Sequence, residues 1–168
     1  YDFNLVKNGL VDSQEMDVHK RYGWNNNIAD KFYTEYTATV LNNAPIKPGA
    51  KYVIDELKKQ GHKLVCITLR GYYRQCEIDI TEQRLKDAGI QFDKIYYKEH
   101  NKVDTCKMEN VDFMIEDSAK NIQSLIKEKI KCLYFRAAGL KSVESDCVTE
   151  VQNWAQILEI ITKNTKKS

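Results

Sequence analysis

The sequence contains few prolines, no cysteine pair spaced as C-x-x-C, no long apolar run and no strong excess of charge of one sign. Because no apolar run approaches the roughly 18 residues of a membrane span, and no signal peptide is visible, we expect no contact with a membrane. The five cysteines are odd in number, which argues against a disulfide framework and favours reduced thiols in a cytoplasmic protein. The net charge of +2 is too small to predict binding to a nucleic acid polymer.

Only two prolines are present, Pro45 and Pro48, and they mark the clearest internal boundary of the chain. Before this boundary we find helical signals and no strand pattern, and apolar spacing predicts a helix over residues 26–41. The expected face of that helix carries residues four apart, namely Ile28, Phe32, Tyr36 and Val40. We therefore expect a helical part over residues 1–44 and a different structural unit over residues 45–168.

After the boundary, amphipathic helical segments alternate with short, continuously apolar strands. The expected strands are residues 62–70, 92–97, 111–117 and 130–135. The expected helices are residues 49–61, 79–89 with Asp79 as its N-cap, 102–110, 119–129 and 150–163. This alternation predicts an α/β fold, with a parallel sheet covered by helices on both faces in a three-layer, Rossmann-like arrangement. Ligands of such sheets bind beyond the carboxyl ends of the strands.

Two of the expected strand ends are followed by groups suited to an oxyanion. Thr68 and Arg70 lie at the carboxyl end of the first strand, and a hydroxyl with a nearby guanidinium suits a phosphate. Lys102 opens the helix after the second strand, where the helix dipole disfavours a cation unless an anion is bound beside it. The alternative interpretation is that Thr68 only ends a strand, while Arg70 and Lys102 are solvated surface residues.

The third expected strand ends in two adjacent carboxylates, Glu116 and Asp117. Two like charges at the end of a buried strand are unfavourable unless a cation lies beside them. Magnesium is such a cation, because it takes one or two protein carboxylates and completes its shell with water and phosphate oxygens. The alternative is that one carboxylate caps the following helix, although Ser118 could serve equally well as the cap.

The order of these groups resembles that of the haloacid-dehalogenase-like phosphatases, most closely their bacterial 5'-nucleotidase or deoxyribonucleotidase-type branch. The resemblance covers roughly residues 28–163 and is carried by "APIKPGAKYVIDELKKQGHKLVCITLR", "NKVDTCK" and "VDFMIEDSAKNI". It implies catalytic roles for Thr68, which would bind the transferred phosphate, and for Lys102, which would stabilise phosphate and nucleophile. Arg70 would then lie beside the substrate. Glu116 and Asp117 would hold Mg²⁺, with Asp117 ranked first because the family usually has aspartate where Glu116 stands.

The family's first motif, Asp-x-Asp-x-Thr at the tip of an N-terminal strand, has no counterpart before residue 45. Asp2 follows no apolar run, and Asp79 opens an expected helix after the second motif, so neither is taken as the nucleophile. Residues 1–44 resemble the remainder of the family's helical cap. We therefore expect that a segment preceding Tyr1 carries the missing strand, or that another segment fills its place.

This missing strand has a physical consequence for the sheet. In the family it lies between the strands that correspond to residues 63–68 and 112–116, so each of these loses a hydrogen-bonding partner. A buried main-chain group left unpaired costs about 1–3 kcal/mol. The summed cost of several such groups exceeds the free energy of unfolding of a typical domain, which is roughly 5–15 kcal/mol. We expect that these two segments are not bonded directly to each other.

The resulting hypothesis is a magnesium-dependent phosphatase that acts on a small phosphomonoester, such as a nucleoside monophosphate, through an aspartyl-phosphate. Aromatic residues of the helical part could stack on a base or form the core of that part, namely Tyr22, Trp24, Phe32, Tyr33 and Tyr36. One alternative is a catalytically inactive relative that binds a phosphate ligand or a protein. Another is a receiver-like domain, which is disfavoured because no acidic pair lies on a first strand. The oligomeric state is left open.

Overall fold

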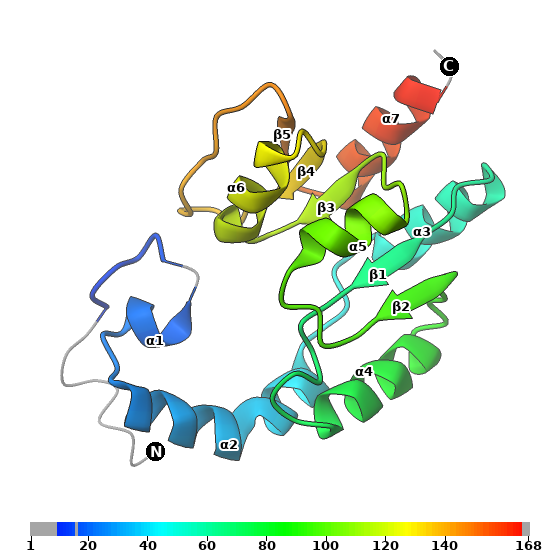
Figure 1. Ribbon diagram of the computed structural model, residues 1–168. Coiled ribbons are helices and arrows are strands. Elements are labelled where there is room, and N and C mark those ends of the chain that lie inside the picture. Colours follow the sequence, from blue (N-terminus) through cyan, green and yellow to red (C-terminus); the bar gives the residue numbers. More distant parts are fainter. Residues whose placement is uncertain (1–9, 16, 166–168) are drawn as a thin grey trace.

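The computed structural model describes residues 10–15 and 17–165, which form seven helices and five short strands (Figure 1). In chain order these are α1 Val18–Arg21, α2 Asn26–Asn43, α3 Ala50–Lys59, β1 Val65–Ile67, α4 Cys76–Asp87, β2 Lys94–Tyr96, α5 Lys102–Met108, β3 Met114–Glu116, α6 Ala119–Lys127, β4 Cys132–Phe135, β5 Val148–Val151 and α7 Trp154–Thr165. Within this described part, no helix has the length and apolar character needed to cross a bilayer.

The strands form two separate parallel sheets, which confirms the α/β class predicted from the sequence. One sheet pairs β1 with β2, and the other has the order β3-β4-β5. The strands of residues 63–68 and 112–116 are not bonded to each other, as the sequence led us to expect. In the part of the chain that the structure describes, no strand bridges the two sheets.

Apolar side chains on opposite faces of the strands form two core clusters. The first contains strand residues packed with α5 and α6, with the buried members Ile67, Val103, Cys106, Met114, Ile122, Leu125, Cys132 and Tyr134. The second packs strand residues against α3 and α7, with the buried members Val53, Leu57, Leu133, Val151, Ile157 and Ile161. Because both faces of β1 and β4 are covered, the sequences of these two strands are apolar at successive positions instead of alternating.

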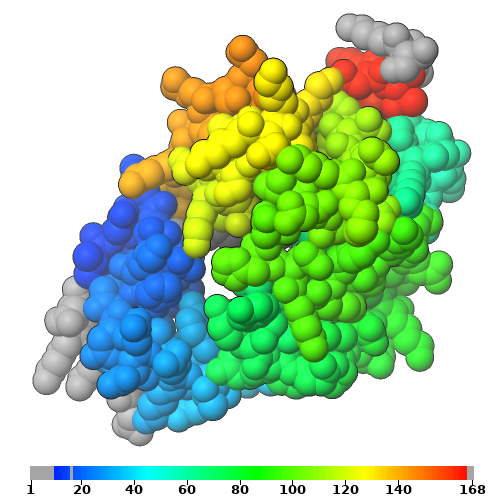
Figure 2. Space-filling view, viewed as in Figure 1, coloured from blue at the N-terminus to red at the C-terminus, as the bar shows by residue number. Residues whose placement is uncertain are grey.

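The helices α1 and α2 lie to one side of the sheets, with α2 against α4 (Figure 1). The guanidinium of Arg74 donates to Thr34 Oγ1 at 2.8 Å, and that of Arg84 donates to the carbonyls at the end of α2. In the space-filling view, a hollow separates the blue residues of this helical part from the green residues of the body (Figure 2). The predicted face of α2 is only partly covered, since Ile28 and Val40 are 39% and 52% exposed.

The sequence predicts reduced thiols, and in the structure all five cysteines are free. Burial raises the pKa of the Cys106 thiol to about 11 and that of the Cys132 thiol to about 12. These two thiols are therefore packing groups of the first core cluster rather than reactive ones.

Two predictions of local structure were wrong. Asp79 is not a helix cap, because α4 begins three residues earlier and places Asp79 in its first turn. The helix predicted for residues 150–163 begins later, at Trp154, and the residues before it form β5 on the edge of β4. Val151, expected on the helix stripe, is instead a strand residue that is 1% exposed. Pairing with β4 makes this segment a strand, and the helical spacing of its apolar residues gives no sign of that pairing.

Candidate functional site

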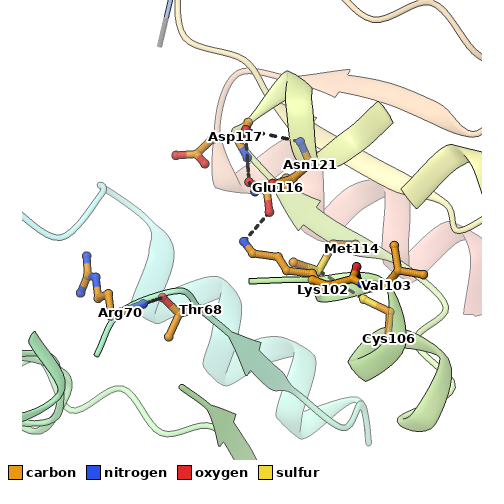
Figure 3. Close-up of polar contacts among 11 residues, drawn as sticks. Thr68, Arg70, Lys102, Val103, Cys106, Met114, Glu116, Asp117 and Asn121 are labelled. Atoms are coloured by element: carbon orange, nitrogen blue, oxygen red, sulfur yellow. Dashed lines mark hydrogen bonds and ion pairs between the residues drawn. The ribbon is translucent and has the colours of Figure 1, made fainter. Parts of the chain in front are cut away.

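An ion pair links the start of α5 to the end of β3. The Lys102 ammonium lies 2.5 Å from Glu116 Oε2, and the two side chains are 17% and 3% exposed (Figure 3). Asn101 caps the same helix, because its side-chain oxygen accepts from the Val103 N–H at 3.2 Å. The anion that the helix dipole requires beside Lys102 is thus provided by the chain itself.

The second oxygen of Glu116 accepts hydrogen bonds at the start of α6. Its donors are the amides of Asp117 and Ser118, at 3.2 and 3.0 Å, and the Asn121 side chain at 3.2 Å. Ser118 is the N-cap, since its hydroxyl accepts from the Asn121 N–H. Both oxygens of the buried Glu116 are therefore satisfied by protein donors, which answers how a buried strand can end in two carboxylates.

Asp117 differs from its neighbour because it is exposed and its carboxylate points away from Lys102 (Figure 3). Partial removal of this carboxyl from water raises the pKa of Asp117, and the negative charge of Glu116 raises it further. A divalent cation beside Asp117 would oppose both effects.

A magnesium ion would find only part of its shell at this position. Among residues 10–15 and 17–165, no three His, Cys, Asp or Glu side chains converge as a metal-ligating group. Asp117 can provide one oxygen ligand, and Glu116 is already held by four donors. Asp117 could therefore hold Mg²⁺ only if water and substrate oxygens completed the coordination shell, which is the usual mode of binding for this ion.

Thr68 and Arg70 lie at the end of β1, where Figure 3 shows them across from Lys102. The Thr68 hydroxyl accepts from the Arg70 N–H at 3.3 Å, so it caps its own loop. The Arg70 guanidinium donates to Thr81 Oγ1 on α4 at 2.9 Å. Arg70 is thus held toward α4, and its role beside a substrate stays a prediction.

The loop after β1 is held by a buried acid that our sequence analysis did not identify. Glu77, 8% exposed, accepts from the Gly71 N–H at 2.8 Å, and its carbonyl accepts from the Thr81 hydroxyl at 2.6 Å. Gly71 has a φ of +85°, in the left-handed region. An acid six residues after a loop glycine was the only signal in the sequence, and it is too common to be diagnostic.

A cavity of about 700 Å³ opens between β1 and β3. Its walls include both strands, and one end is lined by charged residues, namely Arg70 after β1, Lys102 at the start of α5, and Glu116 and Asp117 at the end of β3. Predicted residues that follow three different strands thus lie near one edge of the cavity, whereas Thr68 is not among the residues that line it. Apart from Asp117, no aspartate of the described part lines this end of the cavity: Asp2 lies outside the described residues and Asp79 is on α4.

No protein-family model matches the chain, and a search of curated proteins finds no match.

At the opposite, amino-terminal end of the strands, Glu109 joins three elements. Its carboxylate accepts from Lys63 at 2.5 Å, from Lys94 at 2.7 Å and from the Tyr96 hydroxyl, and these bonds lower the pKa of Glu109 to about 2. A lowered pKa stabilises the folded state above the unfolded value of 4.5, and this stabilisation is lost as pH falls toward about 2. We expect Glu109→Gln to be less stable at neutral pH and to lose less stability through this acid window.

The measurement is the melting temperature of both proteins between about pH 5 and pH 2. Glu128→Gln is the matched control, because Glu128 pairs with Lys107 at 2.6 Å while both side chains stay about half exposed. The control should follow the wild type. If the melting temperatures of wild type and Glu109→Gln fall in parallel as the pH is lowered, the bonds of Glu109 to Lys63, Lys94 and Tyr96 contribute nothing to stability in acid.

Proposed function

We propose that this chain provides the phosphate-binding and magnesium-binding part of a phosphatase for small phosphomonoesters. The fold class that goes with the proposal is a haloacid-dehalogenase-like core, in which the two parallel sheets belong to one three-layer, Rossmann-like unit. The observation that supports it best is the gathering of Lys102, Glu116 and Asp117 at one rim of the cavity, beside the end of β1.

Each group has a distinct task in this proposal. Lys102 has three N–H donors, of which Glu116 accepts one, so the remaining donors are available for phosphate oxygens. Glu116 orients Lys102 by this bond. The Thr68 hydroxyl accepts from the Arg70 N–H and keeps its own O–H, which it would donate to the phosphate. Mg²⁺ bound at Asp117 would offset the negative charge of the phosphate.

The nucleophile is assigned to an aspartate outside the described residues, which would form and release an aspartyl-phosphate. Nucleoside monophosphates are the candidate substrates. The aromatic side chains of the helical part contact one another, with ring centroids 5.6 Å apart for Tyr22 and Trp24 and 5.1 Å apart for Trp24 and Phe32. These contacts favour the interpretation that they form a small core, so the proposal does not use them for base stacking.

A second candidate is a catalytically inactive relative that binds a phosphate ligand without turnover. It is favoured by the fact that, within the described residues, the rim has no aspartate beyond Asp117, which the phosphatase proposal assigns to Mg²⁺. Binding of inorganic phosphate to the 168-residue chain, measured by calorimetry with and without Mg²⁺, tests the site common to both candidates. Phosphate release from nucleoside monophosphates by the polypeptide expressed from its gene separates them.

Magnesium-dependent release supports the phosphatase, and binding without release supports the inactive relative. If neither binding nor release is detected, both candidates are rejected.

We predict opposite effects of Asp117→Asn on stability and on ligand binding. The raised pKa of Asp117 means that the folded state disfavours its ionised form, so its contribution is stabilising below the unfolded pKa of 3.8 and is lost as pH rises. At neutral pH the neutral amide should therefore raise the melting temperature. The same change should abolish the increase in melting temperature that Mg²⁺ with phosphate causes in the wild type.

Asp112→Asn is the control for this prediction, because Asp112 is also exposed and lies just before the same strand. It should leave the response to Mg²⁺ unchanged. A normal magnesium response in Asp117→Asn would remove Asp117 from the metal site.

A further inference from the structure

Two neighbouring tyrosines on the loop after β1 are strongly exposed. Tyr72 and Tyr73 are 53% and 70% exposed, in the loop of residues 68–75 that joins β1 to α4. Their rings meet edge-on, with centroids 5.0 Å apart and planes inclined by 75°. Single exposed apolar residues are ordinary on a protein surface, but a contiguous group of them indicates a contact site. The pair on this loop is therefore a candidate binding surface.

A third ring comes from the loop after β2. The centroid of the His100 imidazole lies 5.8 Å from that of the Tyr72 ring, and the two planes are inclined by 50°. His100 is itself exposed. We call Tyr72, Tyr73 and His100 the aromatic platform. Because neither neighbour lies parallel to Tyr72, the exposed half of Tyr72 is available to a further ring.

Main-chain hydrogen bonds join the two loops that carry the platform. The Lys98 N–H donates to the Arg70 carbonyl and the Glu99 N–H donates to the Thr68 carbonyl, both at 3.0 Å. The Glu99 carboxylate also accepts from the Thr105 hydroxyl of α5 at 2.9 Å. Rings on loops that are held in this way lose less conformational freedom on binding than rings on unattached loops.

The main chain on either side of Tyr72 is also held. The Tyr72 N–H donates to the Leu69 carbonyl at 3.0 Å, and the Gly71 N–H donates to the buried Glu77 at 2.8 Å. The exposure of Tyr72 is thus a property of an ordered loop. A tyrosine in such a place offers a large, rigid contact area at a low cost in conformational entropy.

The same two loops carry the groups that the proposed function assigns to the phosphate. Tyr72 follows Arg70 by two residues, and His100 precedes Lys102 by two. Thr68 and Arg70 lie across from Lys102 (Figure 3). Two residues span at most about 7 Å of extended chain. A phosphate between Thr68 and Lys102 would therefore lie beside the platform, at a distance that a sugar can bridge.

The size of the platform favours a single planar ring over a protein surface. A specific protein interface buries about 800 Å² on each partner. The large apolar side chains that this loop exposes are only three, those of Leu69, Tyr72 and Tyr73. A nucleobase, in contrast, needs only the face of an aromatic side chain to stack on. A base joined to a phosphate would engage the platform and the rim residues together.

We propose that the aromatic platform binds the base of a nucleoside monophosphate, with Tyr72 as the ring on which the base stacks. The base then contacts the two loops of the body, and not the aromatic side chains of the helical part, which pack against one another. Stacking selects a planar ring but tolerates differences among bases, since every base has a π face. The inference rests on the proposed function for the phosphate end of the ligand.

Calorimetric titration of the 168-residue chain with Mg²⁺ tests the platform, using two ligands that differ only in the base. Adenosine 5'-monophosphate should bind about tenfold more tightly than ribose 5-phosphate. Tyr72→Leu keeps an apolar side chain but removes the ring, so this difference should disappear while ribose 5-phosphate binds as before. Tyr73→Leu, which removes the neighbouring ring, should reduce the difference and serves as a second variant if Tyr72→Leu does not fold.

Two control variants and a spectroscopic signature isolate the role of the ring. Tyr72→Phe loses only the hydroxyl and should bind both ligands as the wild type does. Tyr52→Leu removes a tyrosine that is 63% exposed on α3, and it should change neither affinity. In NMR spectra, the adenine protons of bound adenosine 5'-monophosphate should shift upfield with the wild type, because they lie over an aromatic ring, and should not do so with Tyr72→Leu.

Adenosine, which has no phosphate, separates this inference from the proposed function. Adenosine binding that Tyr72→Leu abolishes, without binding of ribose 5-phosphate or inorganic phosphate, supports the platform and rejects the phosphate site. Equal binding of adenosine 5'-monophosphate and ribose 5-phosphate by the wild type rejects the platform and leaves the phosphate site standing. The platform is also rejected if neither Tyr72→Leu nor Tyr73→Leu reduces the difference, if Tyr52→Leu reduces it as much, or if none of these ligands binds.

Discussion

Replacing Lys102 by methionine is expected to lower the free energy of unfolding by about 3 kcal/mol. Methionine keeps most of the volume of the side chain but removes its charge, which leaves Glu116 as a carboxylate that is 3% exposed and has lost its only cationic partner among the described residues. The three remaining donors to Glu116 limit the loss but do not neutralise the charge. Urea unfolding at neutral pH measures the effect.

Lys107→Met is the matched control on the same helix. Lys107 pairs with Glu128 at 2.6 Å, but the side chains are 53% and 44% exposed, so this change should cost less than about 1 kcal/mol. Similar losses in the two variants would show that burial of the Lys102–Glu116 pair has no energetic importance.

Adding Glu116→Gln to Lys102→Met separates the structural role of Lys102 from its proposed binding role. The neutral amide removes the unpaired charge, so the double variant should recover part of the lost stability, with a coupling energy of about 1–3 kcal/mol. Phosphate binding should stay lost, because no ammonium remains at the rim. Recovery of phosphate binding together with stability would mean that Lys102 acts only through the fold.

The sequence was a good guide to the elements after Pro48, for a physical reason. Strands covered on both faces are continuously apolar, and the intervening helices carry apolar stripes at a different period. Both are local patterns, so β1, β2, β3 and β4 could be predicted without knowledge of their neighbours. The strand β5 could not, because its residues Thr149 and Glu150 are exposed and only pairing with β4 identifies it.

The candidate site was predicted as a set of residues but not as a set of contacts. Helix and strand boundaries indicated that Lys102 and Glu116 lie near one edge of the sheet. That the two residues pair with each other depends on how α5 packs beside β3, and no local pattern encodes this packing. For the same reason, the sequence could not indicate that Glu116 would be buried and bonded while Asp117 would be exposed.

The division of the strands into two sheets corresponds directly to the missing partner strand that the sequence led us to expect. Residues 63–68 and 112–116 were expected to lack a common partner strand, and the structure has a cavity of about 700 Å³ between them. Cores normally contain few voids larger than a water molecule, so a cavity of this size between two apolar strand edges is costly unless it is filled. The edges of β1 and β3 and the charged residues Lys102, Glu116 and Asp117 therefore border the same cavity.

The second large effect is expected for Gly71→Ala, which should destabilise the protein by about 3 kcal/mol. Gly71 has a φ of +85°, where a Cβ atom is unfavourable, and the added atom would lie 2.5 Å from the Ile78 side chain. The loop cannot shift freely, because the Gly71 N–H donates to the buried Glu77. The same loop positions Thr68, so phosphate binding should weaken as well.

Gly61→Ala separates the two causes, because Gly61 has a φ of +86° but no atom within 4 Å of the added Cβ. It should cost only the backbone term, about 1–2 kcal/mol, and leave phosphate binding unchanged. In a double-mutant cycle, Ile78→Ala should recover the part of the Gly71→Ala loss that comes from the clash. If the two glycine variants lose equal free energy of unfolding, the loop after β1 can shift to accommodate the added Cβ. A loop that shifts in this way could not hold Thr68 in place for a phosphate.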